Sequence, residues 1–275
     1  MPERTTERAG GRAGRKAAPI PVPTLDMERD LAAGGADYIV GFDEVGRGAL
    51  AGPAMVGAAV IRSADLLAGR VDVPAGVADS KLLTERKREA IYDELTDWCA
   101  AWAVGSASNE EIDEWGIGYA LGVAALRALD EAERALGLGD DTQAGRERQN
   151  DQGHQSGPES QKAPSIGAIL DGPYDYITKT VGTFDAPVVP VVPHVVTRVK
   201  GDRHCATVAT AAVIAKVTRD RLMAGIAHDH PEWEAYGWAG NKGYGSAAHR
   251  AAIAELGPTP LHRVSWHLTD NRAAD

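Results

Sequence analysis

Carboxylates stand at the ends of predicted elements, where they could form one reactive site. Asp43 and Glu44 directly follow the apolar run Tyr38–Phe42, and Asp171 follows a second apolar run. Asp220 lies in a long segment of helical period. Several carboxylates in one place repel one another, and a divalent cation relieves that repulsion. Oxygen ligands without Cys or His suit Mg²⁺ or Mn²⁺ rather than Zn²⁺. Any one of these acids, taken singly, is better explained as a helix cap or a surface residue.

A glycine-rich turn follows the adjacent acids. Neighbouring residues of an extended strand point to opposite faces, so Asp43 and Glu44 converge on one site only if the chain turns there. Gly46 and Gly48 predict such a turn and allow the backbone to approach a ligand closely. The segment does not fit G-x-G-x-x-G closely, and no G-x-x-x-x-G-K-[ST] occurs, which argues against a dinucleotide or triphosphate loop.

Basic residues concentrate around the fourth acid. Lys216 lies four residues before Asp220, on the same helix face, which indicates either a surface ion pair or a phosphate contact beside a metal ligand. Tyr244 lies between two glycines, where its ring could stack on a sugar or a base. His249 and His262 follow, and lone histidines are more often structural than catalytic. The basic residues between positions 198 and 221 are Arg198, Lys200, Arg203, Lys216, Arg219 and Arg221.

A mixed sheet with helices is needed to position these residues. Short apolar runs bounded by turn residues predict strands, and longer segments of helical period predict helices. Strands that come first, followed by strands mixed with helices, indicate an α/β domain. The predicted strands are 38–42, 54–61, 102–107, 166–170 and the proline-limited 187–192, and the predicted helices are 110–136, 205–226 and 245–256.

The composition is typical of a soluble globular protein. Of the 275 residues, 44% are hydrophobic and 25% are charged, and no apolar run is long enough to predict a membrane span. The formal net charge is −10, so any nucleic-acid contact must come from a local basic patch. Two cysteines, Cys99 and Cys205, argue against a disulfide framework. Because the N-terminus lacks a signal-peptide pattern, we expect a cytoplasmic protein.

Three polar segments flank or interrupt the predicted domain. Residues 1–33 are rich in Arg, Gly, Ala and Pro without apolar periodicity, which predicts a disordered basic arm. Residues 139–165 contain no aliphatic residue except alanine and predict a disordered insert. Residues 269–275 predict a flexible tail. One folded domain is therefore expected over residues 34–268.

Six short motifs occur between Tyr38 and Trp266. They are GFDEVGRGALAGP, Asp79-Ser80-Lys81, Leu170-Asp171-Gly172, KGDRHCATVATAAVIAKVTRD, KGYGSAAH and LHRVSW. In this order they resemble the type 2 ribonuclease H family, ribonuclease HII. Ser246 stands where that family commonly has Thr, and Trp266 where Phe is usual. Gly-Arg-Gly at 46–48, and no sign of an added N-terminal sheet domain, favour this family over ribonuclease HIII, which typically has Gly-Lys-Gly.

The resemblance implies a ribonuclease H-like catalytic domain, with a central mixed β-sheet flanked by helices and a helical C-terminal portion. It implies that four carboxylates bind the divalent cations used in catalysis, Mn²⁺ or Mg²⁺, two of which would lie about 3.5–4 Å apart. These are Asp43, Glu44, Asp171 and Asp220. It also implies that the loop senses the 2′-hydroxyl, that a tyrosine packs on the deoxyribose and that two lysines bind phosphates. The implied substrate contacts are Gly46, Arg47, Gly48, Tyr244, Lys81 and Lys200.

The activity implied by the resemblance is that of an endoribonuclease. It would hydrolyse the RNA strand of RNA–DNA hybrids and cut 5′ of single ribonucleotides in duplex DNA, leaving 3′-hydroxyl and 5′-phosphate ends. Expected partners are these nucleic acids and no membrane, and we expect a monomer. One alternative is a DNA nuclease or resolvase of the same superfamily, which has no 2′-hydroxyl to sense with Gly46–Gly48. Another is an inactive hybrid-binding protein, which should have lost one of the four acids.

Overall fold

A computed structural model describes residues 21–139 and 163–268. At its centre lies a five-stranded mixed sheet of order β3-β2-β1-β4-β5. β2 is antiparallel to β1 and β3, whereas β1, β4 and β5 run parallel to one another. The strands are β1 (Tyr38–Val45), β2 (Ala54–Arg62), β3 (Ala101–Ala107), β4 (Ile166–Asp171) and β5 (His194–Arg198).

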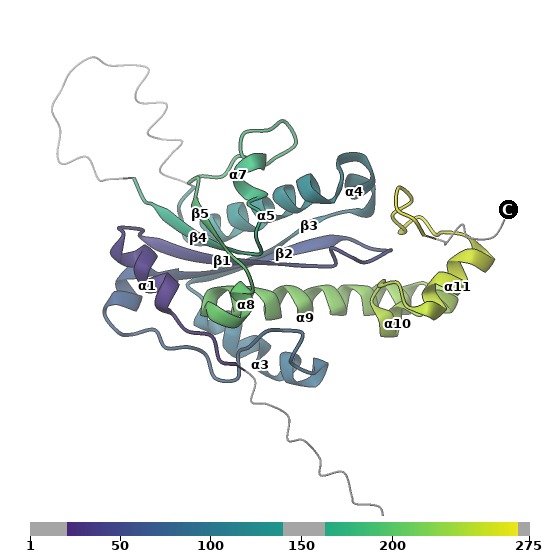
Figure 1. Ribbon diagram of the computed structural model, residues 1–275, viewed down its shortest axis with the longest axis horizontal. Coiled ribbons are helices and arrows are strands. Elements are labelled where there is room, and N and C mark those ends of the chain that lie inside the picture. The colour runs from purple at the N-terminus through teal and green to yellow at the C-terminus, as the bar shows by residue number, and fades with distance from the viewer. Residues whose placement is uncertain (1–20, 140–162, 269–275) are drawn as a thin grey trace, which may run out of the picture.

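Helices cover both faces of the sheet (Figure 1). One face packs on α5, which is rich in alanine and leucine, and the other packs on the long helix α9. None of the described helices is long and apolar enough to cross a membrane. The helices are α1 (Asp26–Ala33), α2 (Ser63–Leu67), α3 (Glu85–Trp98), α4 (Asn109–Trp115), α5 (Ile117–Ala135), α7 (Ile177–Thr180), α8 (Gly201–His204), α9 (Ala206–Asp229), the 3₁₀ helix η1 (Pro231–Tyr236), α10 (Trp238–Asn241) and α11 (Ala247–Leu256).

β1 extends further than its apolar run. Val40 and Phe42 pack in the core beside α5, whereas Ile39 and Val45 pack on the opposite face with residues of α9. Strand alternation continues through Val45, because β1 remains paired with β2 along its whole length. The expectation that the strand ends at Phe42 is therefore wrong: Asp43 and Glu44 lie within it.

Helix α9 approaches the sheet at backbone contact distance. A Cβ atom on Gly41 of β1 would lie 2.3 Å from the backbone carbon of Thr207, and one on Gly57 of β2 would lie 2.5 Å from the carbonyl oxygen of Ala211. Both distances are shorter than real Cβ contacts, so only glycine permits this packing. α9 has 24 residues, a length of about 36 Å, and it carries Asp220 in its second half.

The first turn of α9 is bound by an N-terminal helix. Glu28 of α1 is fully buried, and its Oε1 accepts hydrogen bonds of 2.9 Å from both the backbone N–H and the hydroxyl of Thr207. A carboxylate at this position satisfies an otherwise unpaired amide and interacts favourably with the helix dipole. Burial raises the pKa of Glu28, and these hydrogen bonds oppose that rise. α1 is thus part of the folded domain.

The C-terminal helices form a small second core. Trp238, Tyr236 and Ile253 pack with Met223 of α9 and with Leu50, which follows β1. Figure 1 shows α10 beside the C-terminal part of α9 and α11 beyond it. This agrees with the expected helical C-terminal portion, and it brings the KGYGSAAH and LHRVSW segments to the end of β1.

Several local expectations are corrected by the structure. The predicted arm 1–33 is wrong for Asp26–Ala33, which is helical. The run 187–192 forms no strand, because its prolines lack amide donors, and the strand follows at His194–Arg198. The helix expected over 110–136 is divided at Gly116, whose φ is +77°. The arm's residues 1–20, the insert's residues 140–162 and the tail 269–275 lie outside the described residues.

Candidate active site

Two aspartates lie side by side on the α9 face of the sheet. Phe42 is paired with Leu170 in the parallel register of β1 and β4, so Asp43 and Asp171 follow at the same level. Both lie one residue beyond positions that face α5, and therefore project toward α9. Glu44 projects to the opposite face. The turn expected to bring Asp43 and Glu44 together occurs after them, at Gly46, where φ is +77°.

Asp43 is buried among other acids. Burial, followed by the charges of Glu44 and Asp171, raises the pKa of Asp43 well above its ordinary value, and only the charge of Lys81 lowers it. This is the electrostatic situation in which a carboxylate cluster attracts a cation. We call Asp43, Glu44, Asp171 and Asp220 the acidic cluster.

Glu44 is held by two side chains from different parts of the chain. Arg47 donates from Nη1 to its Oε1 at 3.2 Å, and the Tyr176 hydroxyl donates to its Oε2 at 3.2 Å. Tyr176 immediately precedes α7 and is half-buried. Burial, and then the charges of Glu44 and Asp43, raise the pKa of this phenol well above its ordinary value, so it remains a donor to Glu44.

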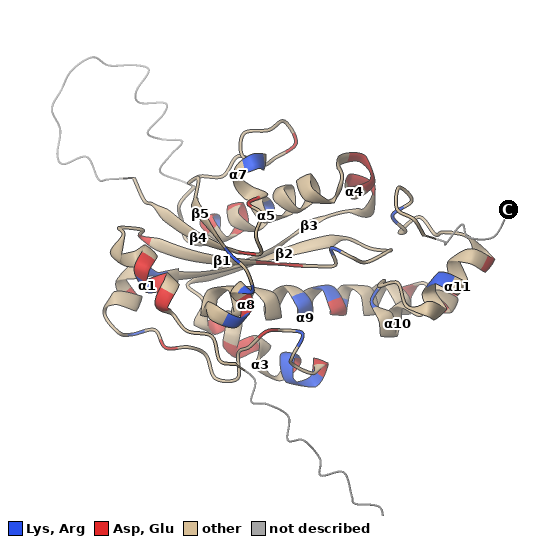
Figure 2. Ribbon diagram, in the orientation of Figure 1, with Lys and Arg blue, Asp and Glu red and all other residues tan. Residues whose placement is uncertain are grey.

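The other two acids also have partners within the chain. The Oδ1 of Asp171 accepts from the backbone N–H of Gly201 at 2.6 Å. Asp220, buried on α9, accepts from Lys216 at 2.7 Å and from Arg88 of α3 at 3.4 Å. The helix ion pair expected from the Lys216–Asp220 spacing is therefore present. Figure 2 shows acidic and basic positions together in this part of α9 and in α3.

The donor set of the acidic cluster fits a hard divalent cation. It offers only carboxylate oxygens, which Mg²⁺ and Mn²⁺ prefer, and the unfavourable charge at Asp43 would be offset by a cation. As the side chains stand, however, no group of three or more His, Cys, Asp or Glu residues within 21–139 and 163–268 could hold a metal ion. Arg88, Lys216 and Arg47 occupy carboxylate oxygens that ion binding would require.

Lys81 lies among acids rather than on an open basic surface. Burial opposes its charge, but Asp43, Asp202 and Asp79 outweigh that effect and raise the pKa of the ammonium. Asp79 is itself buried and pairs with Arg203 of α8 at 2.9 Å. Burial, with the charges of Asp79 and Asp171, raises the pKa of Asp202 to about 6. Lys81 thus belongs electrostatically to the surroundings of the acidic cluster.

Lys200 is exposed and has a left-handed backbone, with φ of 59° and ψ of 40°. This conformation is uncommon for a residue with a side chain. It turns the chain so that the next amide, that of Gly201, reaches Asp171. The second left-handed residue other than glycine in the described chain is Lys242, which precedes Gly243 and Tyr244.

The Gly46-Arg47-Gly48 turn contacts Tyr244 directly. The backbone N–H of Gly46 donates to the Tyr244 hydroxyl oxygen at 3.0 Å, and Ala49 forms an antiparallel bridge with Tyr244. The structure thus brings together the implied sugar-sensing turn and the implied stacking residue, which are far apart in the sequence. The turn opens the segment 46–53, which we call the arginine-supported loop for the two side chains beneath it.

Those side chains are Arg219 and Arg263, both fully buried. Arg263 donates to the carbonyl oxygens of Gly46 at 2.7 Å, Arg47 at 2.9 Å and Gly52 at 3.0 Å. Burial and then the charge of Arg219 lower the pKa of Arg263 to about 9. Burial also lowers the pKa of Arg219. Sequence reasoning assigned neither residue to the site.

Two buried histidines support the same region. Thr259 N–H donates to Nδ1 of His262 at 2.8 Å, so the proton of this ring lies on Nε2 and is donated to Nε2 of His249 at 3.0 Å. The indole of Trp238 donates to the same His249 nitrogen, and His249 Nδ1 donates to the Tyr244 carbonyl at 2.9 Å. Every ring nitrogen is used with both rings neutral. Both rings thus serve as hydrogen-bonding groups inside the fold.

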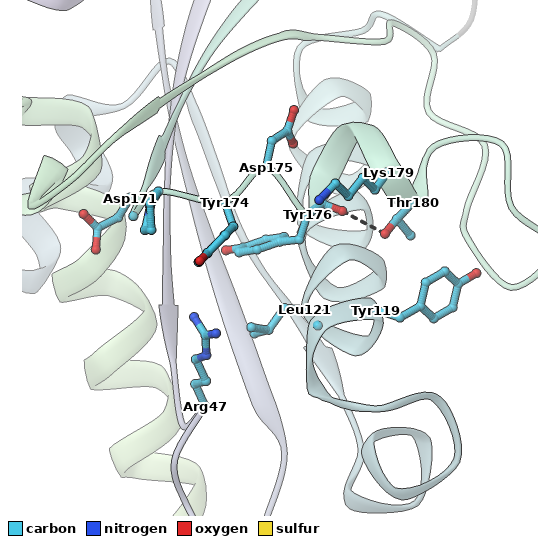
Figure 3. Close-up of a pocket in the computed structure, with 12 residues that line it drawn as sticks. Arg47, Tyr119, Leu121, Asp171, Tyr174, Asp175, Tyr176, Lys179 and Thr180 are labelled. Carbon is cyan, nitrogen blue, oxygen red and sulfur yellow. Dashed lines mark hydrogen bonds between the residues drawn. The ribbon is translucent and has the colours of Figure 1, made fainter.

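A cavity of about 380 Å³ opens on the Glu44 side of the sheet. Its lining includes Arg47, Tyr174, Tyr176 and Lys179, and it reaches Asp171. Figure 3 shows the hydroxyl ends of Tyr174 and Tyr176 near the end of Arg47. The cavity thus adjoins one member of the acidic cluster, Asp171, and the two side chains that donate to Glu44, Arg47 and Tyr176.

Comparisons with known proteins point to one family. The sequence pattern of the family described as "Ribonuclease HII" matches residues 40–135 and 173–269, which include Asp43, Glu44 and Asp220. Asp171 lies just before the second matched segment. A Streptomyces avermitilis protein described as ribonuclease HII is 40% identical over 253 residues, covering 92% of this chain and 87% of that protein. A ribonuclease HII of Roseiflexus castenholzii is 37% identical, covering 89% and 88%.

Solved structures share the fold. The ribonuclease H2 of Pyrococcus horikoshii OT3 superposes with a TM-score of 0.55 at 23% identity, covering 84% of this chain and 94% of that one. Bst-RNase HIII in complex with Mn²⁺ gives a TM-score of 0.58 at 20% identity, covering 87% and 70%. These likenesses establish a ribonuclease H-like architecture.

Proposed function

Because the chain belongs to the ribonuclease HII family, we propose that its acidic cluster is the cleavage centre of a metal-dependent endonuclease. The chain is an endoribonuclease of RNA–DNA hybrids, as its family is. The observation that carries the assignment of residues is the burial of Asp43 beside Asp171 on adjacent parallel strands, with its pKa raised by the neighbouring acids.

Bound divalent cations would polarise the phosphate, lower the pKa of an attacking water and stabilise the leaving oxygen. Asp43, Glu44, Asp171 and Asp220 would hold them, and we propose Mn²⁺ or Mg²⁺ as the ions. Tyr176 would orient Glu44 through its hydrogen bond, and the Gly201 amide would orient Asp171. Lys216 would transfer from Asp220 to a nearby phosphate oxygen, whereas Arg88 would stay in place, because it is buried and donates to the carbonyls of Ser80 and Leu83.

The arginine-supported loop would recognise the ribonucleotide. Gly46, Arg47 and Gly48 lie next to the acidic cluster, and Tyr244 contacts Gly46, so a sugar beside the scissile phosphate would meet both. Lys81 and Lys200 would contact backbone phosphates, which position a strand without reading its sequence. On this basis we propose cleavage 5′ of single ribonucleotides in duplex DNA as well as in hybrids, with 3′-hydroxyl and 5′-phosphate products. Since one chain supplies all these groups, we propose that it acts as a monomer.

A duplex with one ribonucleotide in an otherwise DNA strand tests the proposal. We expect a single cut on the 5′ side of that ribonucleotide when Mn²⁺ or Mg²⁺ is present, and none with EDTA. An all-DNA duplex of the same sequence should remain intact, and its cleavage would favour the DNA nuclease alternative. Metal-independent cleavage, or none under any condition, would overturn the proposal.

A further inference from the structure

Arg219 and Arg263 are two buried cations without an anionic partner. Both side chains are fully buried, and neither pairs with a carboxylate within residues 21–139 and 163–268. Burying a guanidinium group is costly unless its donors are all well used. Here nearly every donor goes to a main-chain carbonyl of one short segment, so the two arginines have a local structural target.

That target is the arginine-supported loop. Arg263 donates to the carbonyls of Gly46, Arg47 and Gly52. Arg219 donates to the carbonyls of Pro53 at 2.9 Å and Ala51 at 3.1 Å. Carbonyl oxygens along the segment therefore point inward, toward the buried cations.

The backbone amides at the tip of the loop take no part in these hydrogen bonds. Arg47 and Gly48 are the exposed residues of the turn, and their backbone N–H groups have no hydrogen-bond partner within the described chain. A peptide unit whose carbonyl is bound inside presents its N–H on the other side, so the tip offers adjacent free donors to solvent. Such donors suit a hydroxyl or phosphate oxygen.

Arg219 also contacts the second recognition element. Its guanidinium carbon lies 5.4 Å from the centroid of the Tyr244 ring, and it donates to the carbonyl of Lys242 at 2.8 Å. It further packs against Gly46, where a Cβ atom would lie only 2.2 Å from its Nε. One buried side chain thus sets the position of Gly46 relative to Tyr244, and the residue next to it in the sequence is Asp220.

We propose that Arg219 and Arg263 are positioning residues for ribonucleotide discrimination: together they orient the Arg47 and Gly48 amides and the Tyr244 ring toward the sugar. The inference rests on the function proposed above and deepens it. Arginine suits this role because its planar fork of five donors binds several carbonyls at once, whereas lysine offers a single point charge. A lysine in either position retains the charge but leaves some of the carbonyls unpaired.

Binding measurements can separate this role from a merely structural one. In an Asp43→Asn background, which prevents cleavage, dissociation constants are compared for a duplex with one ribonucleotide and for its all-DNA counterpart. Loss of two charge-assisted hydrogen bonds predicts that Arg263→Lys and Arg219→Lys each lower the ratio of the two affinities by about tenfold or more. Binding of the all-DNA duplex should change by less than about threefold.

Arg127→Lys is the matched control. Arg127 also donates to a carbonyl, that of Ser106, but it pairs with Glu111 and lies away from the loop, so its ratio should not change. An unchanged ratio in Arg263→Lys and Arg219→Lys, or a parallel loss of both affinities, would overturn the inference. If the parent protein itself does not prefer the ribonucleotide duplex, the proposed function fails, and the inference fails with it.

A second measurement needs no change to either arginine. In the same Asp43→Asn protein, the amide resonances of Arg47 and Gly48 should shift when the ribonucleotide duplex is added, and shift much less with the all-DNA duplex. Equal shifts with both duplexes would contradict the proposal even if the arginine variants fail to fold.

Discussion

The acidic cluster and the arginine-supported loop meet at the C-terminal end of β1, yet their charged side chains are partnered in opposite ways. In the acidic cluster, like charges lie together, and two of the carboxylates have side-chain partners that could exchange, Lys216 on Asp220 and Arg47 on Glu44. In the loop, buried cations are bound to main-chain carbonyls that cannot move independently. The protein thus pre-organises the loop that we propose recognises the sugar, whereas the proposed cleavage centre can exchange Lys216 and Arg47 for cations and phosphate.

The largest expected effect is on the acidic cluster. Asp43→Asn should lower the cleavage rate by about a thousandfold or more, since metal-assisted catalysis contributes several kcal/mol to the barrier. Binding of the hybrid should be largely retained, because the loop is built without Asp43. Single-turnover kinetics with matched binding assays measure both. Undiminished cleavage would refute the metal role, and lost binding would show that the two regions are not separable.

A methyl group tests how rigidly the loop is supported. Gly46→Ala would place a Cβ 2.2 Å from Arg219 at a φ of +77°, and we expect a loss of about 2–5 kcal/mol in the free energy of unfolding. Gly48→Ala is the control, because a Cβ there meets nothing within 4 Å, and it should change stability by less than about 1 kcal/mol. Urea denaturation of both variants gives the comparison. Equal stabilities of the two variants would show that the loop can shift to make room for the added methyl group and is not rigidly supported.

A fall in pH should lower the stability of the fold through His262, which lies in the region that supports the loop. His262 is neutral in the fold, with its pKa lowered to about 4 by burial and by His249, whereas an unfolded histidine titrates near 6.5. The unfolded state therefore binds the proton first, and stability is lost as pH falls from about 6.5 toward 4. We expect a loss on the order of 1–2 kcal/mol between pH 7 and 5.

Urea midpoints at the two pH values measure this loss. His262→Gln should reduce the pH dependence, whereas His194→Gln, at an exposed position, should not. Protonation of His262 above pH 6 in an NMR titration would contradict the assigned network.

The smallest expected effect concerns one partner in the acidic cluster. Tyr176→Phe removes the hydroxyl that donates to Glu44 but keeps the ring that lines the cavity. Because Arg47 still contacts Glu44, we expect the turnover rate to fall only about three- to tenfold, equivalent to one hydrogen bond. KM should remain nearly unchanged. A loss as large as that of Asp43→Asn would mean that the partners of the acidic cluster are not exchangeable.

Sequence reasoning could identify the acids because buried runs end beside them and the motifs have a characteristic order. It placed the end of β1 too early, since a carboxylate after Phe42 suggests a strand end, whereas Asp43 and Glu44 remain paired with β2 inside the strand. It missed Arg219 and Arg263, because arginine is ordinarily a surface residue and main-chain carbonyl partners leave no pattern in the sequence. Tyr176 was missed for a similar reason: its partner lies 132 positions away.

The close packing of α9 on Gly41 and Gly57 has a consequence for how this enzyme can evolve. The sheet is in contact with helix α9, which carries Asp220, through these glycines, so a substitution at Gly41 or Gly57 can only move the sheet and the helix apart. Any larger side chain at either glycine would push α9 away from the sheet and so change the distance between Asp43 and Asp220. The size of the side chains at positions 41 and 57 therefore limits how closely the sheet that carries Asp43 and the helix that carries Asp220 can pack.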